Sequence, residues 1–74
     1  MAEKTVTACL IIIGNEILSG RTVDANLSHL AKKLGEIGVR LAEARVVPDD
    51  EQEIVDAVNS CRAKHDYVFT TGGI

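Results

Sequence analysis

The sequence has few of the residues with which proteins bind nucleic acid. It contains no tryptophan, one phenylalanine and one tyrosine, so it lacks the aromatic side chains on which proteins stack unpaired bases. The formal net charge of the 74 residues is −3, which gives no general attraction to nucleic acid or to an anionic membrane surface. We therefore expect neither a nucleic acid nor a membrane as a partner.

Cysteine is equally scarce, and no long apolar run is present. Cys9 and Cys61 are far apart, do not have metal-site spacing, and each lies among apolar neighbours. We predict two buried free thiols, with a disulfide or a reactive thiol as the alternative.

The apolar part of MAEKTVTACLIII is too short to span a bilayer and lacks a signal-peptide cleavage pattern. We expect a cytoplasmic protein.

The composition that remains is that of a small folded domain. Apolar residues make up 46% of the chain and charged residues 26%, which is typical of globular proteins and not of disordered ones. A chain of 74 residues has room for one domain at most, with a core near the lower limit of independent stability.

The first half of the chain changes its hydrophobic period twice. Thr5–Ile13 is β-branched and almost continuously apolar, which predicts a strand covered on both faces. Glycines and polar residues then predict a loop from Gly14 to about Val23. From Asp24 the period is helical, and Gly38 stands where a helix C-terminus favours positive φ. The expected apolar face of this helix comprises Leu27, Leu30, Ala31, Leu34 and Ile37.

The second half has the pattern strand, helix, strand. Val39–Val47 alternates and then turns apolar, which predicts a strand. The strand should end before Pro48, because proline cannot donate to the ladder. Residues 49–64 predict a helix in which Asp49 or Asp50 is the N-cap, and Asp50 has capping-box spacing to Glu53. Its expected apolar stripe comprises Ile54, Val55, Val58 and Cys61. The segment YVFTT predicts a third strand.

Short apolar strands separated by helices predict an α/β fold with a parallel sheet and right-handed crossovers. Two helices cannot cover both faces of a complete sheet of this class. We therefore expect residues 1–74 to be the N-terminal portion of a single domain, truncated before the domain is complete. A flavodoxin- or receiver-like fold is an alternative, although receivers place paired acids after the first strand and this chain places them after the second.

The candidate chemistry lies in three loops, GNEILSG, PDD and TTGG, because open parallel sheets bind ligands beyond the carboxyl ends of their strands. Glycines let backbone amides approach phosphate oxygens. Carboxylates such as Glu16, Asp49 and Asp50 become useful beside a phosphate when Mg²⁺ bridges the two. The loops thus indicate a nucleotide or a phosphorylated cofactor.

Each of these signals also has a purely structural explanation. Two glycines after a strand can be a tight turn, and Asp49 and Asp50 can be helix caps. Asp24 and Asn26 can both cap the first helix, and Glu16 can be a solvated loop residue.

Taken together, the segments GNEILSGRTVDANLSHLAKKLGEIGV, RVVPDDEQEI and DYVFTTGGI resemble the start of the molybdopterin-binding domain family. This family includes molybdenum-cofactor biosynthesis proteins and the N-terminal domain of competence/damage-inducible protein A, which is the more similar through GNE and VDAN. The resemblance runs from about Thr5 to Ile74 and depends on three separated motifs in the same order.

The resemblance implies a three-layer α/β/α fold that binds a phosphorylated pterin or an adenine nucleotide above the strand ends. Asp49 corresponds to an acidic position linked to Mg²⁺ and adenylyl chemistry, so it is the predicted catalytic residue. Asp49 and Asp50 are the predicted metal ligands. Asn15 stands where many relatives have aspartate. The predicted ligand-binding residues are Gly14, Glu16, Asp24, Asn26, Thr71, Gly72 and Gly73.

For an intact protein of the competence/damage-inducible type, the resemblance implies Mg²⁺-dependent hydrolysis of a nucleotide pyrophosphate such as ADP-ribose. One alternative is a molybdenum-cofactor biosynthesis protein that binds or adenylylates molybdopterin, and another is a non-catalytic binding or assembly domain. In the family, TTGGI continues into residues that complete the phosphate and metal site, so we expect these 74 residues alone to be inactive. Relatives form dimers or trimers, and an exposed sheet edge favours a homo-oligomer.

Overall fold

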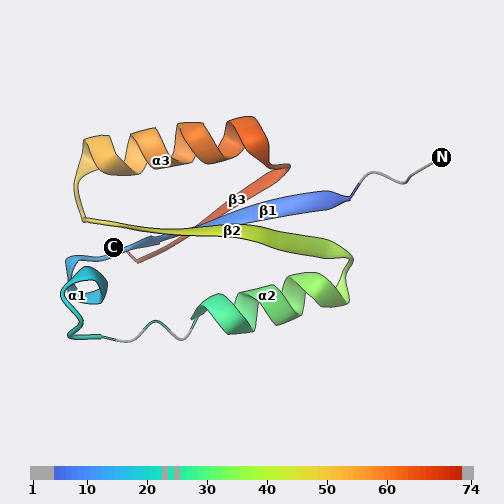
Figure 1. Cartoon of the computed structure of the whole chain (residues 1–74), viewed down its shortest axis with the longest axis horizontal. Coiled ribbons are helices and arrows are strands. Elements are labelled where there is room, and N and C mark those ends of the chain that lie inside the picture. Colours follow the sequence, from blue (N-terminus) through green and yellow to red (C-terminus); the bar gives the residue numbers. More distant parts are fainter. Residues whose placement is uncertain (1–4, 23, 25, 73–74) are drawn as a thin grey trace.

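The protein has one parallel sheet of three strands in the order β2-β1-β3, with helices on both faces (Figure 1). The computed structural model describes residues 5–22, 24 and 26–72. Helix α2 lies on one face of the sheet and α3 on the other, which confirms the predicted α/β fold with parallel pairing. The elements are β1 (Val6–Ile13), α1 (Asn15–Leu18), α2 (Asn26–Glu36), β2 (Val39–Val47), α3 (Glu51–Lys64) and β3 (Tyr67–Gly72).

The central strand β1 forms the middle of the core. Its residues from Ala8 to Ile13 are all buried, because β1 has a strand on each side and a helix above and below. This confirms the prediction of a strand covered on both faces. Strand β2 lies at an edge and alternates between half-buried and exposed residues, as predicted. A register shift after Ala8 brings Glu43 of β2 opposite Cys9 of β1.

The core between α3 and the sheet, called the α3 core below, consists of Cys9, Ile11, Ile13, Val47, Ala57 and Cys61. The predicted stripe of α3 was wrong at Val55, which is 43% exposed, whereas Ala57 is buried. The prediction for α2 was wrong at Leu27, which is 38% exposed, and at Ile37, because α2 ends at Glu36 and Ile37 is 75% exposed. Leu34 is the buried residue of α2.

The predicted ends of the elements are mostly confirmed. Strand β2 ends at Val47, before Pro48, and Gly38 follows α2 with a φ of 82°. Asp50 is the N-cap of α3, and its side chain accepts a hydrogen bond from the Glu53 amide at 3.1 Å. The predicted loop after β1 is different, because it contains the single helical turn α1. Four residues are too few for a helical period to be visible in the sequence.

In the described part of the chain, no helix has the length and apolar character needed to cross a membrane.

Candidate ligand-binding site

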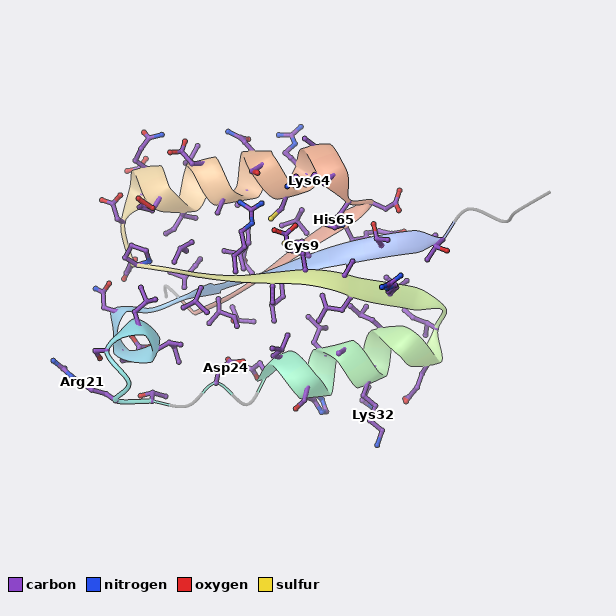
Figure 2. All side chains as sticks on the ribbon, viewed as in Figure 1. Cys9, Arg21, Asp24, Lys32, Lys64 and His65 are labelled. Carbon is purple, nitrogen blue, oxygen red and sulfur yellow. The ribbon has the colours of Figure 1, made fainter. Side chains whose placement is uncertain are left out.

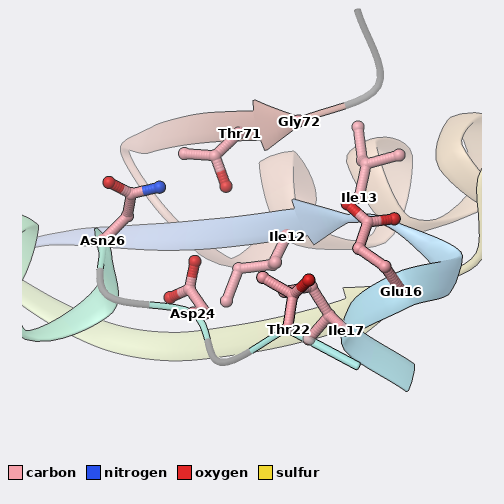
Figure 3. A pocket seen from close by; sticks show the side chains of 9 residues that line it. All are labelled: Ile12, Ile13, Glu16, Ile17, Thr22, Asp24, Asn26, Thr71 and Gly72. Carbon is pink, nitrogen blue, oxygen red and sulfur yellow. The ribbon is translucent and has the colours of Figure 1, made fainter. Parts of the chain in front are cut away.

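A cavity of about 310 Å³ opens at the carboxyl ends of β1 and β3, next to the start of α2 (Figure 3). We call it the strand-end cavity. Five of the predicted ligand-binding residues lie around it, contributed by the first loop, the start of α2 and the end of β3. The lining residues are Ile12, Ile13, Glu16, Ile17, Thr22, Asp24, Asn26, Thr71 and Gly72.

The end of β3 supplies an unpaired hydroxyl and a glycine that cannot be replaced without strain. Thr71 Oγ1 is buried and has no hydrogen-bond partner among the described residues. Gly72 has a φ of 81°, and a Cβ added there would collide with the backbone carbonyl oxygen of Ile13. The end of β3 therefore brings a buried polar atom without a partner to the cavity wall, and the glycine allows β3 to pack closely against the end of β1. Gly73, also predicted to bind ligand, lies outside the described residues.

The first loop is folded around the backbone carbonyl of Glu16. That oxygen accepts hydrogen bonds from the amides of Arg21 at 3.0 Å and Thr22 at 3.2 Å, and from Ser19 Oγ at 3.2 Å. The loop therefore turns back, and Thr22 and Ile17 line the cavity. Sequence reasoning missed both residues. Their only signals were a threonine in a loop beyond a strand end and an apolar residue in an otherwise polar motif.

Gly14 and Asn15 connect the first loop to β2 and do not line the cavity. The Gly14 amide donates to the Val47 carbonyl at 3.1 Å, which extends the contact between β1 and β2. Asn15 Oδ1 accepts a hydrogen bond from the Asp49 amide at 3.1 Å. Asn15 thus joins the first loop to the loop that follows β2. A Cβ at Gly14 would lie 2.9 Å from the carboxylate oxygens of Glu16, the far end of a flexible side chain.

Asp24 combines a structural contact with a place in the cavity wall. Its Oδ2 accepts a hydrogen bond from the Leu27 amide at 3.0 Å, which caps the start of α2. Asn26 is the first residue of α2 and also lines the cavity. The sequence left both residues open as the cap, and the structure shows Asp24 in that contact.

The acidic residues after β2 lie outside the cavity wall. Asp49 and Asp50 are both exposed, and Asp50 caps α3. Among residues 5–22, 24 and 26–72, no group of three metal-ligating side chains gathers at the strand ends. The described residues therefore do not by themselves form a divalent-metal site there. The catalytic role of Asp49 and the metal roles of Asp49 and Asp50 stay predictions.

A separate polar cluster lies on the α3 side of the sheet. Glu43 accepts hydrogen bonds from both His65 and Arg45, and these lower the pKa of its carboxyl from 4.5 to about 2. The contacts are 2.9 Å from His65 Nε2 and 2.7 Å from Arg45 Nε. Arg45 also bonds Ser60 Oγ at 3.1 Å, and His65 Nδ1 lies 3.1 Å from Thr7 Oγ1. The polar groups of this cluster thus find most of their hydrogen-bond partners within the protein, so we interpret the cluster as structural.

Comparison with known proteins agrees with this fold. The family described as a probable molybdopterin binding domain matches residues 9–74. A CinA-like protein from Citrifermentans bemidjiense is 42% identical over 65 residues, which is 88% of this chain and 16% of that protein. A probable FAD synthase from Caenorhabditis elegans is 43% identical over 68 residues, which is 92% of this chain and 13% of that protein.

A solved structure shares the arrangement of strands and helices. The crystal structure of CinA from Thermoplasma acidophilum, described as a protein of unknown function, matches with a TM-score of 0.88 and 35% identity. The match covers 96% of this chain and 43% of that one. The chain spans between 13% and 26% of the length of the first curated relatives. It belongs to the molybdopterin-binding domain family and is similar to the CinA-like members of that family.

Proposed function

We propose that this domain binds a small phosphorylated ligand, an adenine nucleotide or a phosphorylated pterin, in the strand-end cavity. As part of a longer CinA-like protein, we propose that such a domain serves Mg²⁺-dependent hydrolysis of a nucleotide pyrophosphate such as ADP-ribose. The observation that carries the binding proposal is the buried hydroxyl of Thr71, which lines the cavity and lacks a partner among the described residues.

A buried hydroxyl without a partner is costly, because it has lost its hydrogen bonds to water. A ligand oxygen in the cavity would restore that bond and would be held in place by it. The volume of about 310 Å³ lies at the lower end of the range for small-molecule sites. It suits part of a nucleotide or a pterin.

The charges around the cavity suggest how such a ligand would lie. The carboxylates of Glu16 and Asp24 repel phosphate, so we propose that the phosphate lies beside Thr71 and not against either carboxylate. Hydroxyl or amino groups of a ribose or a pterin ring can donate hydrogen bonds to the two carboxylates. The side chains of Ile12 and Ile17 add an apolar surface for a ring.

The test compares two neighbouring threonines in calorimetric titrations with ADP-ribose, ATP and molybdopterin. Thr71→Val removes the cavity hydroxyl and keeps the shape of the side chain, and we expect it to weaken binding by about tenfold, the effect of one hydrogen bond. Thr70→Val is the matched control, since Thr70 is exposed and does not line the cavity. Equal affinities in the two variants would contradict the proposed site.

The choice of ligand separates the functions that share this cavity. Tighter binding of ADP-ribose supports pyrophosphate hydrolysis. Tighter binding of ATP together with molybdopterin supports adenylyl transfer, which is the second candidate because two relatives carry the name probable FAD synthase.

The role of Asp49 is tested in a longer CinA-like protein that carries this domain. Asp49→Asn removes the charge, and because Asp50 is the cap of α3, stability should stay the same. We expect the Mg²⁺-dependent release of AMP from ADP-ribose to fall by at least about 100-fold. Full activity in this variant would exclude Asp49 from the reaction.

A further inference from the structure

The two cysteines of the chain meet in the α3 core. Cys9 lies on β1 and Cys61 on α3, and both are completely buried. Figure 2 shows Cys9 on the side of the sheet that faces α3. The two sulfur atoms are 2.7 Å apart, whereas non-bonded heavy atoms pack best at about 3.5–4.0 Å. The fold therefore holds the two sulfurs closer together than ordinary packing would.

A shared metal ion does not fit this spacing. The carboxylate of Glu43 lies within 4.8 Å of both sulfurs, so the three groups could suggest a zinc site. Two Zn–S bonds of about 2.3 Å in a tetrahedral site hold their sulfurs about 3.8 Å apart. The carboxylate oxygens of Glu43 are also already occupied by His65 and Arg45. The arrangement favours a direct bond between the two sulfurs.

We propose that Cys9 and Cys61 form a reversible disulfide that fastens α3 to the central strand when the protein meets a low-molecular-weight disulfide. One cysteine thiolate attacks a sulfur of the small disulfide, which forms a mixed disulfide and releases one small thiol. The second cysteine then attacks the protein sulfur of the mixed disulfide and releases the second small thiol. The two protons of the protein thiols end on the two small thiols.

The closed fold makes this exchange slow and makes its product durable. Burial is the main cause that raises the pKa of the Cys9 thiol to about 12, and the contact with Cys61 is the second. The reactive thiolate is therefore scarce while α3 is packed against the sheet. The exchange requires a local opening at the end of α3. There the His65 amide bonds the Cys61 carbonyl at 3.0 Å, and the Asp66 amide bonds the Thr7 carbonyl at 3.0 Å. Once α3 has closed over the disulfide, reductants are excluded in the same way.

The disulfide would join residues 52 positions apart, and a loop of this length strongly restricts the unfolded chain. We expect the midpoint of thermal unfolding to rise by at least about 10 °C. Glu43, Arg45 and His65 would keep their contacts, because none of them takes part in the exchange.

The experiment incubates the protein with oxidised glutathione in roughly tenfold excess over reduced glutathione. Remaining thiols are then blocked with iodoacetamide, and the intact mass, the peptide map and the thermal midpoint are measured. We expect the loss of two hydrogen atoms without alkylation, a peptide pair that joins Cys9 to Cys61, and the higher midpoint. Dithiothreitol added during unfolding should reverse all three changes.

Single variants supply the matched controls. Cys9→Ala and Cys61→Ala each keep one thiol, so the same treatment should leave the midpoint of each variant unchanged relative to its own reduced form. This comparison holds even where alanine lowers the starting stability.

Four results would overturn the proposal. These are two thiols that remain reduced, a stable glutathione adduct on one cysteine, a disulfide between two copies of the chain, or protection of both thiols by zinc chloride alone.

Discussion

The α3 core and the strand-end cavity are both built on strand β1, yet their polar groups differ. In and beside the α3 core, Glu43, Arg45 and His65 bond one another and neighbouring hydroxyls. At the cavity, the hydroxyl of Thr71 is buried without a partner among the described residues. The polar groups of the first region have partners within the protein, whereas the second region has a hydrogen-bonding group left for a ligand.

The difference follows from where each region lies along β1. Alternate residues of β1, namely Cys9, Ile11 and Ile13, belong to the α3 core, and Figure 1 shows α3 over one face of the sheet. Beyond the ends of β1 and β3, the described residues that border the space come from the first loop, the start of α2 and the strand ends themselves. Stability should therefore depend mainly on the first region, and ligand affinity on the second.

The largest expected effect is on stability and comes from the α3 core. Ile11→Ala removes a completely buried side chain and should lower the free energy of unfolding by about 3 kcal/mol, measured by urea denaturation. Ile37→Ala is the control, because Ile37 is 75% exposed, and it should change this free energy by less than about 0.5 kcal/mol. Similar losses in the two variants would contradict the assignment of the core.

A glycine pair tests the close approach of β3 to β1 at the cavity. Gly72→Ala should lower the free energy of unfolding by about 2 kcal/mol and weaken ligand binding, since φ is positive and the new Cβ meets the Ile13 carbonyl. Gly35→Ala lies in α2 with open space around it, and it should raise stability by about 0.5–1 kcal/mol. A stable Gly72→Ala variant would argue against this turn geometry.

A smaller effect separates the two roles of Asp24. Asp24→Asn keeps a good helix cap, so the unfolding free energy should change by no more than a few tenths of a kcal/mol. Loss of the charge should alter the affinity for ADP-ribose by about three- to tenfold in calorimetric titrations. An unchanged affinity would restrict Asp24 to capping. Lys32→Gln, on the exposed side of α2, is the control.

The smallest effect concerns pH. The pKa of Glu43 is lowered in the folded protein, from 4.5 to about 2. Its ionised form therefore stabilises the fold above pH 4.5, and this stabilisation is lost as the pH falls from 4.5 towards 2. Solvent screening keeps the effect modest, because the side chain is 28% exposed. Urea denaturation should show that the wild type has a higher free energy of unfolding than Glu43→Gln above pH 4.5, and that this difference disappears as the pH falls towards 2. A constant difference would contradict the contribution of the ion pair.

Much of the fold could be predicted because its signals are local. A continuous apolar run indicated β1, alternation indicated β2, and a proline, a glycine and an aspartate marked the ends of β2, α2 and α3. The failures at Val55 and Ile37 arose where burial depends on how a helix lies against the sheet and where it ends. Periodicity does not contain that information.

The candidate site was only partly predictable. Motif positions brought Glu16, Asp24 and Thr71 into consideration, and all three line the cavity. Thr22 and Ile17 were missed because only the hydrogen bonds to the Glu16 carbonyl turn the first loop back over the strand ends. No local pattern records such a closure.

The sequence by itself determined the order of strands and helices apart from the short α1, together with the parallel sheet and the family, because these depend on hydrophobic period, turn residues and motifs along the chain. Only the tertiary structure decided that Asp24 caps α2 and that the Thr71 hydroxyl is buried without a partner among the described residues. It alone also brought Cys9 against Cys61. The cap is a local choice between two polar residues that the sequence allows equally. The cysteine contact and the burial of the Thr71 hydroxyl exist only after separate elements have packed together.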